Sequence, residues 1–310
     1  MYFLSEQANL SMNDCHNLFF IAFKRWIELI KQKVDTKIER CFENEKNDVI
    51  TELTKFGSSS IEVSNCFNHM LQFWKLINWP DSFGSDILLN ELIESLSRAV
   101  IRYANLVKES NQLILNPSPT SSPSLSSPEQ QPVNTLSIGK PSETYQKIII
   151  TTNNIERVRE SLKNFLAEID VHNNNHQKAT NTSSITPDKL KVIESNRAIF
   201  ETCISETSDY LIQIIENSLE IIVNSKINND MQAHMFYLFE SPECAPVQES
   251  ISRIVKYLDM NLVNYKELVY KANFERLLKL IWIKLLVEID ANLKKGDTVS
   301  FFFNITILKD

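Results

Sequence analysis

Glycine is scarce enough in this chain to limit its possible folds, because only 4 of the 310 residues are glycines. An average soluble protein of this length contains about 22. Glycine supplies the positive-φ turns and close backbone approaches on which phosphate-binding loops and most α/β active sites depend. No GxGxxG, GxxxxGK[ST], GxSxG or HExxH motif occurs. The scarcity therefore disfavours α/β enzyme folds.

Apolar residues recur every three or four positions over most of the chain, which is the spacing of one face of an α-helix. The first stripe consists of Phe19, Phe23, Ile27, Ile30, Val34, Ile38 and Cys41. A second helix is expected from Ser58, a residue suited to a helix N-cap, to just before Pro80. A third carries apolar residues from Leu88 to Leu106 and extends to about Leu115. Helices of this length joined by short turns are expected to pack as an up-down bundle.

Two polar segments interrupt the helical pattern. Residues 116–144 contain six of the ten prolines and many serines, so we expect a disordered loop there. Residues 171–187 are rich in asparagine and end at Pro187, which suits the first turn of the next helix. We predict an all-α fold with one helical bundle over 13–115 and a second over 145–310.

Two stretches of the second half are harder to interpret. Ile148–Thr152 is rich in β-branched residues and fits either a strand or a helix. The densest apolar region follows a break at Ser241–Pro242 and includes Ile251, Val255, Leu278 and Trp282. Like the other tryptophans, Trp282 is expected to anchor the core.

The charge balance argues against a nucleic-acid partner, since 32 basic residues face 39 acidic ones. The stretch Lys24–Arg40 is locally basic, but Glu28, Asp35 and Glu39 interrupt it, which is typical of a solvated helix face. The five cysteines are scattered, and neither a signal peptide nor a transmembrane segment is apparent. A cytoplasmic location is therefore expected.

Residues that carry chemistry are few and dispersed. His172 and His176 have the spacing of a metal-ligand pair, but no nearby cysteine or glutamate completes a site, so two exposed loop histidines are expected. His69 and His234 are isolated, and a hydrolase that uses either is the enzymatic alternative. Carboxylate pairs such as Glu91 with Glu94 fit the polar faces of helices. We therefore predict no enzyme, no metal and no cofactor.

Several short motifs occur in one order along the chain. They comprise Phe23, Trp26 and Ile27; Ser58–Ile61; Leu76–Pro80 with Trp79; Ala99–Ala104 with Tyr103; Asn153, Asn154 and Glu156; Tyr257–Leu262 with Leu258 and Asp259; Ala272–Leu278 with Asn273, Phe274 and Arg276; and Trp282. This order resembles the two homology regions of the MUN domain in the Unc-thirteen family of vesicle-priming proteins. The Asn-Phe-x-Arg and Phe301–Phe302 strings resemble the branch of brain angiogenesis-inhibitor-associated relatives.

The resemblance implies an elongated rod of stacked helical bundles, related to tethering complexes, in which these signature residues are structural. It implies a scaffold that promotes SNARE assembly before exocytosis of synaptic or dense-core vesicles. The implied partners are syntaxin and its Sec/Munc-type chaperone, and the implied location is peripheral at the plasma membrane, a vesicle or the presynaptic terminal. A generic exocyst-like helical tether is the alternative function.

Some family features have no counterpart here. The family's syntaxin-opening pocket lies upstream of the region with which this chain begins, so no residue here inherits that role. The calcium-binding and diacylglycerol-binding modules, through which the family contacts membranes, are also absent. Because the second homology region would continue beyond Asp310, a fragment, a truncated gene model or a short isoform is expected.

Overall fold

The structure is a computed structural model that describes residues 15–45, 55–79, 82–115, 141–179, 187–239 and 247–294. Its helices are α1 (Cys15–Glu43), α2 (Ser58–Ile77), α3 (Ser82–Leu115), α4 (Glu143–Ala179), α5 (Pro187–Ile222), the π-helical turn η2 (Val223–Ile227), α6 (Asn228–Phe239), α7 (Val247–Leu268) and α8 (Lys271–Lys294). No strand occurs within these ranges, so the predicted all-α class is confirmed.

The chain divides into two compact units. Unit 1 comprises Met1–Glu45, Ser58–Leu106 and Arg157–Leu211, and unit 2 comprises Lys46–Gly57, Val107–Glu156 and Ile212–Asp310. Helices α3, α4 and α5 therefore contribute residues to both units. The predicted division into homology regions 13–115 and 145–310 follows sequence order instead, and it stays a prediction.

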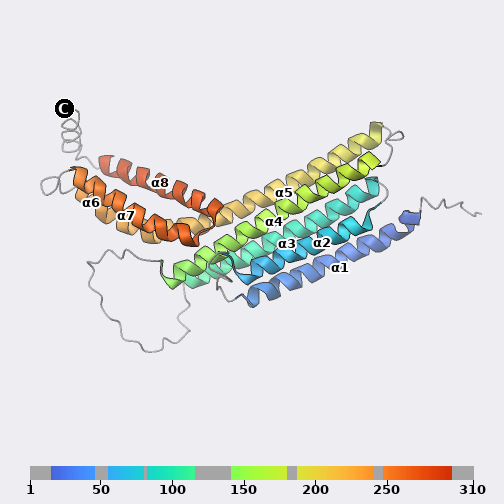
Figure 1. Ribbon diagram of the computed structural model, residues 1–310, viewed down its shortest axis with the longest axis horizontal. Coiled ribbons are helices and arrows are strands. Elements are labelled where there is room, and N and C mark those ends of the chain that lie inside the picture. The colour runs from blue at the N-terminus through green and yellow to red at the C-terminus, as the bar shows by residue number, and fades with distance from the viewer. Residues whose placement is uncertain are drawn as a thin grey trace, which may run out of the picture. The chain divides into compact units, whose positions relative to one another are not determined.

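Unit 1 is built from α1, α2 and parts of α3, α4 and α5, which run alongside one another (Figure 1). The predicted stripes supply its core, since Ile27, Ile38 and Phe67 are all buried. Phe19, at the start of the first predicted stripe, is instead 62% exposed. The neighbouring Phe20 is half-buried there, with its ring centroid 5.9 Å from that of Trp79, so the predicted stripe does not identify the packed face at this end of α1.

The ends of α2 are defined by local chemistry. The Ser59 main-chain N–H donates to a carboxylate oxygen of Glu45 at 2.9 Å, which satisfies one of the unpaired donors of the first turn. At the other end, Asn78 has a φ of 46°, a left-handed conformation that asparagine tolerates better than most residues. The helix thus ends before Pro80, as predicted, although Pro80 itself lies outside the described residues.

Unit 2 contains α6, α7, α8 and η2 together with the first part of α4 (Figure 1). The ambiguous segment Ile148–Thr152 is helical, with Ile148 and Ile149 fully buried. The Thr152 hydroxyl donates to the Ile148 carbonyl at 2.6 Å, so its polar group is satisfied within the helix despite burial. Burial of these isoleucines outweighs their modest strand preference.

The predicted polar gaps are shorter than expected where the structure describes them. Helix α4 begins at Glu143 and continues to Ala179, so residues 171–179 are helical and that part of the second predicted gap is wrong. Helix α5 begins at Pro187, as predicted. The proline-rich segment 116–140 lies outside the described residues, as do 180–186 and 240–246.

Trp282 is not a core residue, which corrects the sequence prediction, because 60% of it is exposed. Leu277, Ile281 and Leu285 form the buried stripe of α8. Leu278 and Trp282 lie on the adjacent stripe and are exposed, as are Ile251 and Val255 on α7. Apolar residues occupy neighbouring positions in these helices, so spacing alone does not identify the stripe that faces the core.

Candidate functional site

The histidines singled out by sequence do not form a site in the described residues. His172 and His176 both lie in α4 rather than in a loop, so the expected loop position is wrong. His69 is exposed on α2, whereas the buried His234 lies with its ring 5.0 Å from that of Tyr257. Over the described ranges, no cluster of three or more His, Cys, Asp and Glu residues has a geometry that could hold a metal ion.

Four of the signature residues meet in a buried polar cluster of unit 2, with Asn153 of α4 at its centre. The Asn153 amide donates to the carbonyls of Lys55 and Leu268, each at 2.9 Å, and its oxygen accepts from the Tyr270 N–H at 3.0 Å. Asn273 donates to the same oxygen at 3.3 Å. One side chain therefore fastens α4 to the turn between α7 and α8.

The other two of these signature residues, Arg276 and Asn154, extend this arrangement, which we call the Asn153 cluster. Arg276 of α8 donates to Glu156 of α4 at 3.1 Å and to Asn273 at 2.8 Å. The Glu156 side chain is fully buried and that of Arg276 is 18% exposed, so the ion pair is largely shielded from water. The neighbouring Asn154 accepts from the Gly57 N–H at 2.7 Å. These contacts are those of a structural joint.

The turn itself receives another hydrogen-bond donor. Lys55, whose φ of 57° is left-handed, places its ammonium 2.7 Å from the Lys266 carbonyl and 3.0 Å from the Val269 carbonyl at the end of α7. Partial burial lowers the pKa of this ammonium, and the nearby carboxylate of Glu267 opposes that shift. A cation at the carboxyl end of a helix also complements the helix dipole.

The remaining signature residues lie elsewhere. Tyr103 is fully buried in unit 1, with its hydroxyl 2.7 Å from that of Ser59. Trp26 and Trp79 are half-buried near Phe23, whose ring centroid lies 5.0 Å and 5.6 Å from theirs. The rest do not join the Asn153 cluster in the described residues: Leu258 and Phe274 are half-buried, Asp259 and Trp282 are exposed, and Pro80 is outside the description.

Unit 1 has a groove of about 460 Å³ between α1 and α2, which we call the α1–α2 groove. It is lined by Trp26, Ile30, Lys33, Val34 and Lys37 of α1 and by Cys66, His69, Met70 and Phe73 of α2. At one end the Trp26 and Phe73 rings lie 4.1 Å apart, and toward the other Lys37 lies 2.6 Å from Glu62. Residue numbers therefore increase along α1 in the direction in which they decrease along α2, so the two helices are antiparallel.

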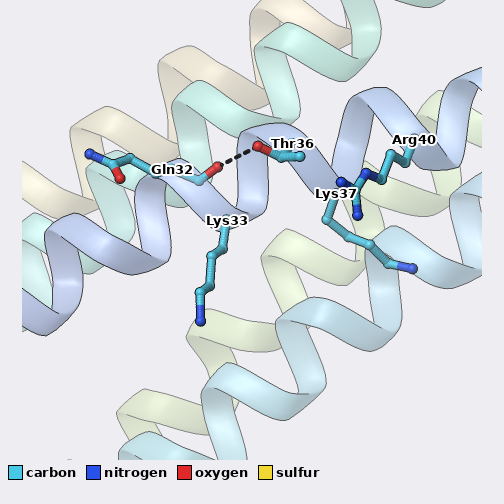
Figure 2. A pocket seen from close by; sticks show the side chains of 5 residues that line it. All are labelled: Gln32, Lys33, Thr36, Lys37 and Arg40. Atoms are coloured by element: carbon cyan, nitrogen blue, oxygen red, sulfur yellow. Dashed lines mark hydrogen bonds between the residues drawn. The ribbon is translucent and has the colours of Figure 1, made fainter.

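Lys33, Lys37 and Arg40 form a stripe of cations on α1, and the first two of them line the groove. Figure 2 shows these side chains around a neighbouring hollow that Gln32 and Thr36 also line. At about 100° per residue, the three cations fall within roughly 60° of one another around the helix. They form a continuous cationic stripe on the helix surface.

Three of the four carboxylates of α1 lie on the side of the helix opposite the cationic stripe. Glu28, Asp35 and Glu39 fall within roughly 40° of one another by the same rotation. Glu28 pairs with Lys31 at 2.5 Å and Glu39 with Arg102 at 2.9 Å, away from the cationic stripe. The three cations of the stripe are therefore separated in space from these three carboxylates, although the two sets alternate in sequence.

Only one cation of this stripe has an ion-pair partner among the described residues. That cation is Lys37, and its hydrogen bond to Glu62 raises the pKa of the ammonium and lowers that of the carboxyl group. Glu62 also accepts from the Cys41 thiol at 3.3 Å, and burial with this bond raises the pKa of Cys41 to about 12. Lys33 and Arg40 have no carboxylate within 4.0 Å in the described ranges.

Sequence reasoning missed Lys55, the ion pair between Glu156 and Arg276 and the presence of the groove, although Glu156 and Trp26 stand in the motifs that it singled out. The available signal for the groove was the spacing of Lys33, Lys37 and Arg40, which places them on one helix face. No sequence signal reveals that residues 55, 153 and 273 meet, because their contacts join segments about a hundred positions apart.

These features define a helical protein with a buried polar joint and an open interhelical groove. The chain is 21% identical over 301 residues to protein unc-13 homolog 4B of Drosophila melanogaster, covering 96% of this chain and 24% of that protein. It is 20% identical over 298 residues to BAI1-associated protein 3 of Mus musculus, covering 96% of this chain and 23% of that protein. A shorter match to human unc-13 homolog D is 22% identical over 99 residues, covering 32% of this chain and 9% of that protein.

The predicted resemblance to the Unc-thirteen family and its angiogenesis-inhibitor-associated branch is therefore confirmed. No protein-family model matches the chain. The chain spans about a quarter of the length of the curated relatives that it matches over most of its own length. None of the described helices combines the length and the apolar composition that crossing a bilayer requires.

Proposed function

We propose that this chain is a non-catalytic helical scaffold of vesicle exocytosis that promotes SNARE assembly by binding syntaxin and its Sec/Munc-type chaperone. The observation that carries the proposal is the similarity to unc-13 homologues over 96% of the chain. The α1–α2 groove supports it, because an open apolar groove bordered by cations suits protein binding. The proposed location is cytoplasmic, peripheral at the plasma membrane, a vesicle or the presynaptic terminal.

In this proposal the signature residues maintain the helical framework, and Trp26 in addition lines the α1–α2 groove. The Asn153 cluster supports such a role, since its polar groups bond to one another and to main-chain groups of α7 and α8. Tyr103 has a similar buried setting in unit 1. Residues 13–115 and 145–310 would be the two MUN homology regions.

The proposal is tested by following SNARE assembly with purified components. Syntaxin bound to its chaperone is mixed with its partner SNARE proteins, and energy transfer between labelled SNARE motifs reports the assembly rate. The chain is expected to raise this rate, and an unrelated helical bundle of equal net charge serves as the control. An unchanged rate, together with capture of exocyst subunits in a parallel pull-down, would contradict the proposal and support a generic exocyst-like tether.

A further inference from the structure

The α1–α2 groove has a size and direction that suit another helix. It extends from the Trp26–Phe73 contact to the Lys37–Glu62 pair, a length of about 17 Å along α1, or roughly three helical turns. Two antiparallel helices leave a groove between their ridges into which the side chains of a third helix can pack. An amphipathic helix laid into a hydrophobic groove is a recurring mode of peptide recognition.

The two ends of the groove differ in chemistry. Trp26, Met70 and Phe73 make one end apolar, and 38% of Phe73 remains exposed. Toward the other end Lys33 and Lys37 line the groove, and Arg40, three residues further along α1, lines the neighbouring hollow that shares these two lysines. Lys33 and Arg40 have no ion pair within the described part of the chain. A helix that matches the groove would therefore carry apolar side chains along the first part of the stripe that faces the groove and carboxylates along the rest of that stripe.

Charge selects among the possible occupants. The chain carries a net charge of −7, so its surface as a whole repels anions, and the cationic stripe is a local exception. An anionic membrane is a broad surface that would face the acidic parts of the chain as well as the stripe. A narrow acidic helix would contact the cations alone, and the concave groove suits its shape better than a flat bilayer.

We infer that the α1–α2 groove binds an acidic amphipathic helix of a partner protein, with apolar side chains against Trp26 and Phe73 and carboxylates against Lys33 and Arg40. This inference rests on the proposed scaffold function and deepens it, because it names the surface and the chemistry of a partner. It assigns no role to the Asn153 cluster.

A designed peptide tests the inference directly, because the groove itself specifies the chemistry of the helix that should bind. The probe is a fluorescent helix of about 18 residues, or five turns, with leucines on one stripe of its first turns and glutamates on that stripe of its last turns. Fluorescence anisotropy with the full chain is expected to show saturable binding that weakens as salt is added. A second peptide with lysines in place of the glutamates is expected to bind roughly tenfold more weakly or not at all.

Matched variants locate the binding. The double variant Lys33→Glu/Arg40→Glu is expected to weaken binding by roughly tenfold, since two attractions become repulsions. Lys256→Glu/Lys279→Glu changes the net charge equally at exposed positions of α7 and α8, so it should leave binding unchanged. Phe73→Ala should weaken binding from the apolar end, and circular dichroism checks that each variant retains its helices.

The outcomes separate this inference from the proposed function. Equal weakening by both charge variants, or equal binding of both peptides, would overturn the groove assignment. The assignment would also be overturned if the acidic peptide does not bind and the chain instead binds phosphatidylserine vesicles in a way that requires Lys33 and Arg40. Groove-dependent peptide binding without any effect on SNARE assembly would support the groove and contradict the proposed function. If the chain speeds SNARE assembly and the Lys33→Glu/Arg40→Glu variant speeds it equally, the result would support the proposed function and contradict the role of the groove.

Discussion

Replacing Asn153 by alanine is expected to destabilise the chain by about 2–5 kcal/mol, because several main-chain groups depend on this one side chain. The substitution removes the partners of the Lys55 and Leu268 carbonyls and of the Tyr270 N–H. Each buried polar group left without a partner costs about 1–3 kcal/mol. Water reaches the partly buried groups, so the expected loss of unfolding free energy is smaller than the sum of the three maximum costs.

The assay is urea unfolding followed by circular dichroism, with Asn264→Ala as the matched control. The amide of Asn264 makes a single bond, to the Met260 carbonyl one turn earlier in α7 at 3.1 Å, so its loss should cost about 0.5–1.5 kcal/mol. Hydrogen exchange at the Tyr270 amide should also accelerate in Asn153→Ala only. Equal losses for the two variants, with an unchanged Tyr270 amide, would refute the assignment of Asn153 as the centre of a joint.

Three further predictions follow from the burial and pairing of individual side chains. Trp282→Ala should cost less than about 1 kcal/mol, whereas Leu277→Ala on the buried stripe of the same helix should cost about 2–5 kcal/mol in urea titrations, and the reverse order would contradict the packing of α8. Arg276→Met should cost about 3 kcal/mol because Glu156 loses its buried ion pair, and adding Glu156→Gln should restore part of that loss; a double variant as unstable as the sum of both singles would count against the pair. Burial and the hydrogen bond to Glu62 raise the pKa of Cys41 from 9.0 to about 12 on folding, so the unfolded thiol ionises first and the unfolding free energy should fall between pH 9 and 12. Because the raised pKa values of Lys37 and Cys66 act in the same direction, Cys41→Ser should reduce that slope, and an unchanged slope would contradict the role of Cys41.

Much of the helical framework was predictable because local chemistry determines it. Ser58 and Pro187 begin helices where capping and first-turn preferences place them. The stripe through Ile27 and Ile38 identified a buried face of α1 from spacing alone. These features depend on residues close together in sequence.

Features that depend on distant segments were not predictable in the same way. The apolar positions of α8 allow two adjacent stripes, and packing of the rest of unit 2 selects the one with Leu277 rather than Trp282. The order of motifs pointed to Asn153 and Arg276, but only the fold shows that they share a joint with Glu156. The cationic stripe was not predicted, because basic and acidic residues alternate along the sequence of α1. Only the rotation of about 100° per residue around the helix separates the cations of the stripe from the carboxylates.

The measurement that tests the proposed function most directly is the binding of the full chain to the syntaxin–chaperone complex. The labelled complex is titrated with the chain, and isolated exocyst subunits are titrated in parallel under the same salt conditions. The account predicts saturable binding to the syntaxin–chaperone complex and none to the exocyst subunits. Binding to exocyst subunits without binding to the syntaxin–chaperone complex would contradict it.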